Sequence, residues 1–156
     1  MGNGKLNFTI YFSKALVGFN HQNLKKLVTN SQQKNATLKV TGYIYFEEGY
    51  FIQYIEAHDE KVLRDLFTEI KLDERHTVIQ SFTSSSDINR RFQDWQMHWI
   101  EKEQILDLKI ENAMLNYMKW LSKDDDILKF NSVTVWSLVD TLAFSKNKLE
   151  NFRKLR

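Results

Sequence analysis

The run Gly49–Glu56, with the sequence GYFIQYIE, constrains the fold more than any other part of the chain. Successive side chains of an extended strand point to opposite faces, so the odd-numbered and even-numbered residues form two separate faces. From residue 50 to residue 55 both faces are apolar apart from Gln53, whose primary amide is therefore set inside the fold. A buried amide costs free energy if its donors and its acceptor are unpaired. Its partner is either protein backbone or water, or a bound heterocycle.

The composition describes an ordinary globular protein. The 156 residues are 42% hydrophobic and 27% charged, which suits one domain with its own core and an appended subdomain. No apolar run reaches the roughly 18 residues of a membrane span, and the N-terminus lacks the apolar segment of a signal peptide. The absence of cysteine excludes disulfides and thiolate chemistry and is typical of a cytoplasmic protein. A net charge of +2 does not support nucleic-acid binding, and no His, Asp and Glu set has metal-ligand spacing.

Alternation and helical periodicity divide the chain into two parts. The first part, residues 1–100, has the order β-α-β-β-α-β-β, which predicts an α+β, ferredoxin-like sheet with one extra strand. We expect both helices to cover the same face of the sheet, which leaves room for a ligand between the helices and that face. The predicted strands are 6–13, 38–46, 49–56, 77–83 and 95–100, and the predicted helices run from about 20 to 33 and from about 60 to 71.

The second part, residues 101–156, is predicted to be helical. Ile105–Leu121 carries an apolar stripe, and Ser132 is a candidate N-cap of a last helix that reaches Phe152. We expect this C-terminal helical pair to cover the other face of the sheet. The reason is that the apolar side chains of 6–12 and 50–54 would otherwise form a large exposed patch there.

Several different short motifs follow one another along the first part of the chain. They are YFS at 11–13, Asn35 with VTG at 40–42, FIQYIE at 51–56, DERH at 73–76 and RRFQDWQM at 90–97. This ordered set resembles the BLUF family, the blue-light sensors that use FAD, over residues 5–100. The resemblance implies a ferredoxin-like domain that binds FAD non-covalently, although the sequence alone leaves open whether FAD or FMN is the natural flavin.

The resemblance implies a role for each matching residue. Tyr11 corresponds to the photoactive tyrosine, and Gln53 to the glutamine that switches between this tyrosine and the flavin N5/C4 carbonyl edge. Asn35 corresponds to the amide that bonds the carbonyl/N3 edge of the ring. Trp95 and Met97, which alternation places on one face of the last strand, correspond to the pair that relays the signal. The remaining matches are expected to line the flavin ring and its ribityl or phosphate portion; they are Ser13, Leu27, Phe51, Ile70, Asp73, Arg75 and His76.

These roles imply a light-driven hydrogen-bond switch without enzymatic turnover. Blue light excites the flavin, Tyr11 loses an electron and then a proton, and the Gln53 amide rotates or tautomerises before the radicals recombine. The rearranged amide then shifts the strand near Trp95 and Met97 and, through it, the helical tail. Lys34 departs from the family pattern, which often has histidine or asparagine there, and its charged head is expected to point to solvent.

No effector domain follows the motifs, so we expect a stand-alone sensor that signals through a separate protein partner or by forming a homo-oligomer. Contacts with a membrane or nucleic acid are not expected. Two other functions stay open. A ferredoxin-like interaction module without flavin would be colourless after purification. RNA binding on an open sheet face needs exposed aromatic and basic residues, which the near-neutral charge does not favour.

Overall fold

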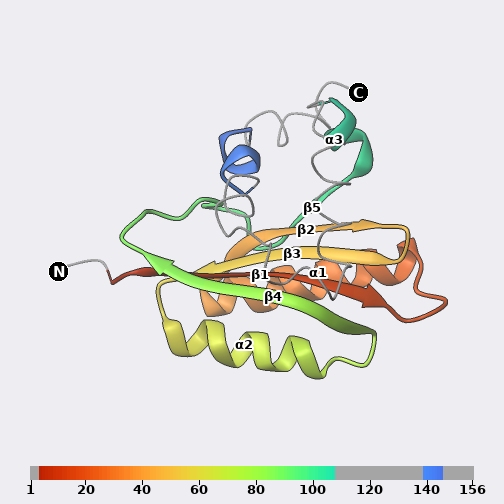
Figure 1. Ribbon diagram of the computed structural model, residues 1–156, viewed down its shortest axis with the longest axis horizontal. Helices are drawn as coiled ribbons and strands as arrows, with labels where there is room; N and C mark the ends of the chain where they lie inside the picture. Colours follow the sequence, from red (N-terminus) through yellow and green to blue (C-terminus); the bar gives the residue numbers. More distant parts are fainter. Residues whose placement is uncertain (1–3, 108–138, 146–156) are drawn as a thin grey trace. The chain divides into compact units, whose positions relative to one another are not determined.

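The computed structural model describes residues 4–107 and 139–145 of the chain (Figure 1). The chain divides into two compact units, Met1–Trp99 and Ile100–Arg156. The element order up to residue 100 is the predicted β-α-β-β-α-β-β, and the sheet has the strand order β4-β1-β3-β2-β5. The elements are β1 (Leu6–Ala15), α1 (His21–Leu38), β2 (Thr41–Glu47), β3 (Tyr50–Ala57), α2 (Glu60–Leu72), β4 (His76–Ser86) and β5 (His98–Ile100).

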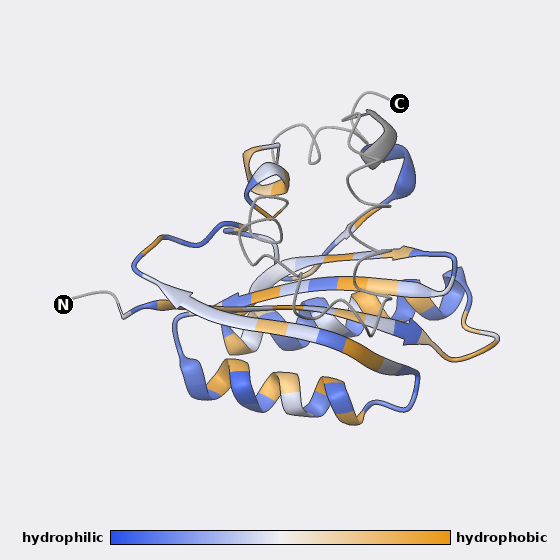
Figure 2. Cartoon of the chain, in the orientation of Figure 1, coloured by the Kyte–Doolittle hydropathy of each residue, from blue (hydrophilic) through white to orange (hydrophobic). Residues whose placement is uncertain are grey.

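Both long helices lie on one face of the sheet, which confirms the ferredoxin-like prediction (Figure 1). Hydrophobic residues recur along α2 between hydrophilic ones (Figure 2), and the helix buries Leu63 and Leu66. These leucines belong to a core between the helices and the sheet, which also contains Leu24, Val28, Val40, Ile44, Phe51, Ile55, Ala57 and Met97. We call this side of the sheet the helix face.

β3 is the central strand, and its two faces are those that the alternation predicts. Gln53 lies opposite Tyr11 on β1 and opposite Ile44 on β2, so these three side chains share the helix face. Gln53 is only 6% exposed, as expected of an amide inside the fold. The opposite face buries a second set of large side chains, which includes Phe8, Ile10, Phe12, Tyr43, Tyr45, Ile52 and Tyr54.

α1 runs beyond the predicted end at residue 33, as far as Leu38. It begins with a capping box, in which the side chains of Asn20 and Asn23 each accept a hydrogen bond from the other's backbone N–H at 2.9 and 3.0 Å. It ends at Lys39, whose left-handed conformation turns its backbone N–H onto the carbonyls of Asn35 and Ala36. Residues 35–38 lack an apolar period, which is why the sequence indicated an earlier end. As a consequence, Asn35 lies in the last turn of a helix.

The turn between β2 and β3 is a tight hairpin. Glu48 and Gly49 have φ values of 51° and 84°. Two successive positive φ angles are typical of the two-residue hairpin turn whose twist matches that of the strands. This turn fixes the pairing of β2 with β3, and with it the placement of Gln53.

A β-bulge in β4 was not predicted. Phe12 pairs with Gln80 and Ser13 pairs with Val78, so Ile79 is an extra residue in β4 with no partner on β1. Because one added residue reverses the alternation, the bulge changes the face on which the beginning of β4 presents its side chains. His76 is thereby directed to the helix face.

The predicted C-terminal helical pair falls mostly outside the described residues. Within the second unit, α3 spans Lys102–Asp107 and residues 139–144 are helical. In that helical turn Val139 and Leu142 are buried and Phe144 is 94% exposed. In the described ranges, no helix combines the length and the apolar character that a membrane crossing requires.

Candidate functional site

A cavity of about 220 Å³ lies between α1 and α2 against the helix face of the sheet. This is the location at which we expected a ligand. Most of the predicted cofactor residues line it: Tyr11, Leu27, Asn35, Phe51, Gln53, Ile70, Asp73, Arg75 and His76. Ser13, Trp95 and Met97 do not line the cavity, but Ser13 and Met97 are hydrogen-bonded to His76 and Gln53, which do.

Each helix contributes a set of residues with helical spacing. On α1 the cavity wall contains residues 27, 30, 31 and 34, and on α2 it contains 66, 69, 70 and the cap residue 73. Residues at i, i+3, i+4 and i+7 share one helix face. Only one or two members of each set were predicted to line the cavity, although this spacing predicts the others. The lining residues that were not predicted are Phe19, Asn30, Ser31, Lys34, Ile44, Leu66 and Glu69.

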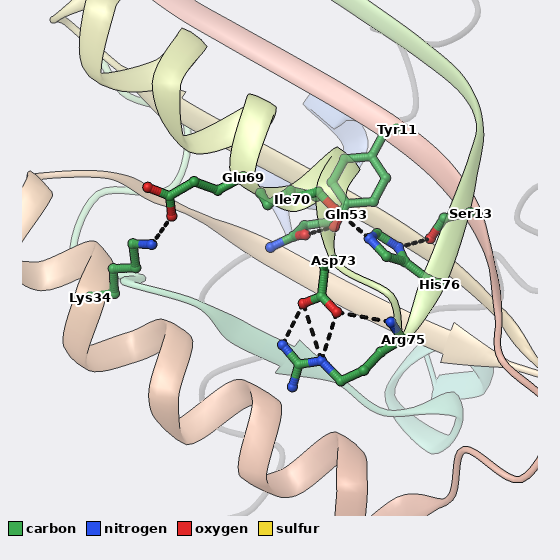
Figure 3. Close-up of polar contacts among 9 residues, drawn as sticks. All are labelled: Tyr11, Ser13, Lys34, Gln53, Glu69, Ile70, Asp73, Arg75 and His76. Carbon is green, nitrogen blue, oxygen red and sulfur yellow. Dashed lines mark hydrogen bonds and ion pairs between the residues drawn. The ribbon is translucent and has the colours of Figure 1, made fainter.

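Tyr11 and Gln53 are joined by a hydrogen bond in the wall of the cavity (Figure 3). The Tyr11 hydroxyl donates to Gln53 Oε1. The other end of the amide, Gln53 Nε2, donates to the Met97 Sδ at 3.3 Å. Gln53 therefore connects the tyrosine on β1 to the methionine that precedes β5.

The Tyr11 phenol is held in its protonated form. Burial raises the pKa of Tyr11 well above its ordinary value, and the negative charge of Asp73 raises it further. The positive charge of Arg75 acts in the opposite direction and is the smallest of the three effects. At neutral pH the phenol thus keeps its proton and serves as the donor to Gln53.

Asn35 and Gln32 hold the main chain that leads into β5. Asn35 Nδ2 donates to the carbonyl of Gln96 at 2.6 Å, and Gln32 Nε2 donates to the carbonyl of Met97 at 2.9 Å. Asn35 also lines the cavity and is 3% exposed. One buried amide thus links the cavity wall to the segment that carries Met97.

The loop after α2 adds a charged pair and an oriented imidazole (Figure 3). Arg75 Nε donates to Asp73 Oδ1 at 2.9 Å, and this hydrogen bonding lowers the pKa of the Asp73 carboxyl. His76 Nε2 lies 2.7 Å from the carbonyl of Ile70, which can only accept, so this nitrogen carries a proton. In the neutral ring, His76 Nδ1 accepts from Ser13 Oγ at 2.8 Å. Ser13 therefore orients a cavity residue without lining the cavity.

Lys34 does not simply point to solvent, contrary to our expectation. Its ammonium group forms an ion pair with Glu69 of the facing helix, and both residues line the cavity (Figure 3). The two side chains are 48% and 60% exposed, so the pair lies where the cavity opens to solvent. A carboxylate on the facing helix supplies the partner, and no local sequence pattern around Lys34 indicates it.

The prediction that Trp95 and Met97 share one strand face is wrong. Met97 packs in the helix-face core, whereas the Trp95 ring stacks on Phe92 with a centroid distance of 5.3 Å. Phe92 in turn packs against Tyr43 on the opposite face of the sheet. The alternation fails because β5 begins only at His98, so residues 95–97 are not in a strand.

The residues of the cavity fit a flavin. Apolar side chains from the two helices face each other across it, and a few amides and charged groups converge from its walls, as cofactor pockets require. Leu27 and Ile70 lie in the cavity wall on the two facing helices, and Gln53 and Asn35 bring amides to the same wall. The volume is below the roughly 300–1,000 Å³ of pockets that enclose a drug-sized ligand. The cavity is therefore smaller than a pocket that would enclose the whole dinucleotide.

Known proteins match this chain in family and in fold. Residues 6–98 match the model of the family described as "BLUF: Sensors of blue-light using FAD". The fold is similar to that of BlsA in its photo-activated state, with a TM-score of 0.67 and 21% identity over 88% of this chain and 94% of BlsA. It is also similar to BlrB, a BLUF protein in its dark state, with a TM-score of 0.67 and 21% identity over 92% of this chain and 98% of BlrB.

A third structure places the same fold in a longer protein. BlrP1 of Klebsiella pneumoniae, in a complex with manganese and cyclic di-GMP, has a TM-score of 0.60 and 24% identity over 90% of this chain, which spans 33% of BlrP1. No curated protein matches the chain. The family model covers more than half of the chain, and the cavity fits the cofactor that the family uses. The chain belongs to the BLUF family of blue-light sensors that use FAD.

Proposed function

We propose that this protein converts blue light into a change in binding to a separate protein partner, through a switch formed by Tyr11, Gln53 and Met97. The observation that supports the proposal is the arrangement of the Gln53 amide. Its oxygen accepts from the Tyr11 hydroxyl, and its nitrogen donates to the Met97 sulfur at 3.3 Å. A single side chain thus connects the tyrosine in the cavity wall to the segment leading into β5.

FAD, when bound, supplies the absorption of blue light and accepts an electron. Tyr11 is the electron donor, and because its phenol is protonated at neutral pH, loss of the electron is followed by transfer of its proton to Gln53 Oε1. The electron and the proton return to Tyr11 at the end of the cycle, so the protein undergoes no net oxidation. The lasting change is in the hydrogen bonds of the Gln53 amide.

A rearranged Gln53 amide must release Met97. The thioether sulfur has no hydrogen to donate and can only accept weakly. In the structure, Gln53 Nε2 is the donor that faces Met97. Rotation of the amide replaces this donor, and loss of a hydrogen from the nitrogen by tautomerisation weakens it. The contact of 3.3 Å is then lost, and the segment that carries Met97 can move.

The proposed output is a shift in shape without turnover of a substrate. Met97 lies immediately before β5, and β5 leads into the second unit of the chain. We propose that this unit meets the partner protein in the cytoplasm and that the light state changes its affinity. A partner that binds only one of the two states has the differential affinity that such a switch requires.

Substitution of Gln53 tests this function. The purified wild-type protein should be yellow, should release FAD on denaturation, and should show a reversible red shift of its flavin absorption under blue light. Q53L should still bind FAD but should lose the red shift, because leucine offers neither the donor nor the acceptor of the amide. Q33L, which changes an exposed glutamine of α1, is the matched control and should keep the shift.

Two results would contradict the proposal. A wild-type protein that stays colourless after addition of FAD would favour a flavin-free interaction module. A red shift of wild-type size in Q53L would remove Gln53 from the switch.

A further inference from the structure

Glu56 is a buried acidic residue on the same strand as Gln53. It lies three positions after Gln53 on β3, so alternation places it on the opposite face of the sheet. Its side chain is 0% exposed. A buried carboxylate is costly unless hydrogen-bond donors surround it. Glu56 must therefore have a set of partners inside the fold.

Four donors surround the carboxylate, two at each oxygen. Glu56 Oε1 accepts from Thr41 Oγ1 at 3.0 Å and from the backbone N–H of Phe92 at 2.7 Å. Glu56 Oε2 accepts from the Tyr54 hydroxyl at 2.9 Å and from the backbone N–H of Arg91 at 3.0 Å. Two of the four donors are thus main-chain groups of the segment between β4 and β5.

This segment has no regular structure of its own. In the part of the chain that the structure describes, residues 87–97 belong to no helix or strand. Arg91 and Phe92, in the middle of the segment, bind Glu56. Met97, at its end, binds the Gln53 amide through its sulfur. The two side chains of β3 therefore hold the middle and the end of the same segment, one from each face of the sheet.

A third contact, at Trp95 between these two points, holds the segment on β2. The backbone N–H of Gly42 donates to the carbonyl of Trp95 at 2.7 Å. A Cβ at position 42 would lie 1.9 Å from the carbonyl oxygen of Tyr54, so only glycine permits this approach of β2 to β3. Neither β2 nor the Gly42 contact depends on the Gln53 amide, so the segment has fixed points at residues 91, 92 and 95.

We propose that Glu56 is a positioning residue of the light response, which anchors residues 91 and 92 so that Met97 is held against Gln53. The proposal rests on the proposed function, because it assigns Met97 to the output. A change at Gln53 then acts on the Met97 side chain at the end of an anchored segment, whose carbonyls at residues 96 and 97 are also held by Asn35 and Gln32. Without the anchor, part of the same change would be absorbed by movement of residues 91 and 92, and the displacement passed on at Met97 would be smaller.

A carboxylate is required for this role, and an amide cannot replace it. All four donors point at oxygen atoms, and two of them are backbone N–H groups that cannot accept a hydrogen bond. In E56Q, one of the two oxygens becomes an NH2 group. In either orientation of the amide, its NH2 group faces the backbone N–H of Arg91 or of Phe92, so two hydrogen-bond donors meet without an acceptor.

Hydrogen exchange in the dark and under blue light tests the proposal in full-length E56Q loaded with FAD. In the dark, the amides of Arg91 and Phe92 should exchange about tenfold faster than in the wild type. Flavin content and the red shift should be retained, because Tyr11 and Gln53 are unchanged. The light-induced change in exchange over residues 95–100 should be lost, although the flavin still responds. A purely structural role for Glu56 would not separate the red shift from the exchange response.

E47Q is the matched control. Glu47 on β2 also accepts from a tyrosine two residues earlier, Tyr45, at 2.7 Å, and so forms the same Tyr-x-Glu pair on the neighbouring strand. E47Q should keep both the red shift and the light-induced exchange response. If E56Q behaves like E47Q while the wild type responds to light, Glu56 is not the anchor. If the wild type itself shows no red shift, the proposed function fails, and this inference fails with it.

Y54F serves where E56Q does not fold. This substitution removes one hydroxyl donor from Glu56 Oε2 and keeps the carboxylate. Exchange at Arg91 and Phe92 should rise about threefold, and the light-induced response over residues 95–100 should be reduced but present. Exchange and light response equal to those of the wild type in Y54F would overturn the proposal.

Discussion

The two faces of the sheet both bury tyrosines, but they use them differently. On the helix face, the Tyr11 hydroxyl binds Gln53 beside a cavity. On the opposite face, the Tyr54 hydroxyl binds the Glu56 carboxylate at 2.9 Å, and the Tyr43 hydroxyl has no hydrogen-bond partner among the described residues. The polar groups of the helix face thus converge on the cavity, whereas those of the opposite face converge on protein main chain.

This difference separates the site of the switch from its support. A cavity next to buried polar groups costs stability, because the atoms that line it lack contacts on one side. The cavity therefore lowers the stability contributed by the helix face, but it provides space for a flat ring. The opposite face has its large aromatic rings in contact with each other; Phe92 lies 5.1 Å from Tyr43 and 5.2 Å from Tyr54, between ring centroids. We therefore expect the opposite face to determine stability and the helix face to determine binding.

Truncation of one large side chain on each face should give the largest contrast. Phe92 is 0% exposed, and F92A should lower the free energy of unfolding by about 3–5 kcal/mol. Ile70 is only partly buried beside the cavity, so I70A should cost about 1 kcal/mol without flavin but should weaken FAD retention. Urea unfolding of the flavin-free proteins and equilibrium dialysis of FAD measure the two effects. Equal losses of stability in both variants would contradict the assignment of the two faces.

The two stacked tyrosines of the opposite face offer a finer test. Their rings lie 5.8 Å apart, between centroids, and burial raises the pKa of both phenols. Y54F should lower the free energy of unfolding by about 1–3 kcal/mol, because it removes a donor from the buried Glu56. Y43F removes a hydroxyl that has no partner in residues 4–107 and 139–145, and it should leave stability unchanged or raise it by about 1 kcal/mol. Thermal unfolding measures the stability of both variants. A larger loss of stability in Y43F than in Y54F would contradict this description of the opposite face.

The ion pair at the opening of the cavity should have the smallest effect on stability. Exposed pairs contribute about 0–1 kcal/mol, so K34A should scarcely change unfolding. It should nevertheless accelerate FAD release, because it removes the contact between α1 and α2 at the opening. K61A breaks an exposed pair with Asp65 that lies within α2, and it should leave the release rate unchanged. Equal release rates in the wild type and K34A would show that the pair does not close the cavity.

Much of the helix face could be predicted from the sequence, because strand alternation and helical spacing determine it. Alternation sorts the side chains of each strand into two faces, the family resemblance implies that Tyr11 and Gln53 share one of them, and helical periodicity places Leu27 and Ile70 on the apolar helix faces. The bulge at Ile79 could not be predicted, since an unpaired residue leaves no mark in a pattern that continues on both sides of it. It is nevertheless this bulge that directs His76 to the cavity.

The segment before β5 shows where such patterns fail. Trp95 and Met97 alternate as in a strand, yet side chains and backbone groups from other elements determine their positions. Glu56, which anchors this segment, has a sequence context that indicates only the end of a strand. Long-range hydrogen bonds to main-chain groups carry no local signal, so the anchor became visible only in the structure.

The most direct test of the account compares two buried tyrosines, one on each face, by the light-minus-dark absorption of the purified proteins. The wild type should show a reversible red shift of the flavin bands. Y11F should bind FAD and show no shift, because no phenol donates to Gln53. Y43F, an equally conservative change of a buried tyrosine on the opposite face, should show the full shift. A full shift in Y11F, or the loss of the shift in Y43F, would contradict the placement of the switch on the helix face.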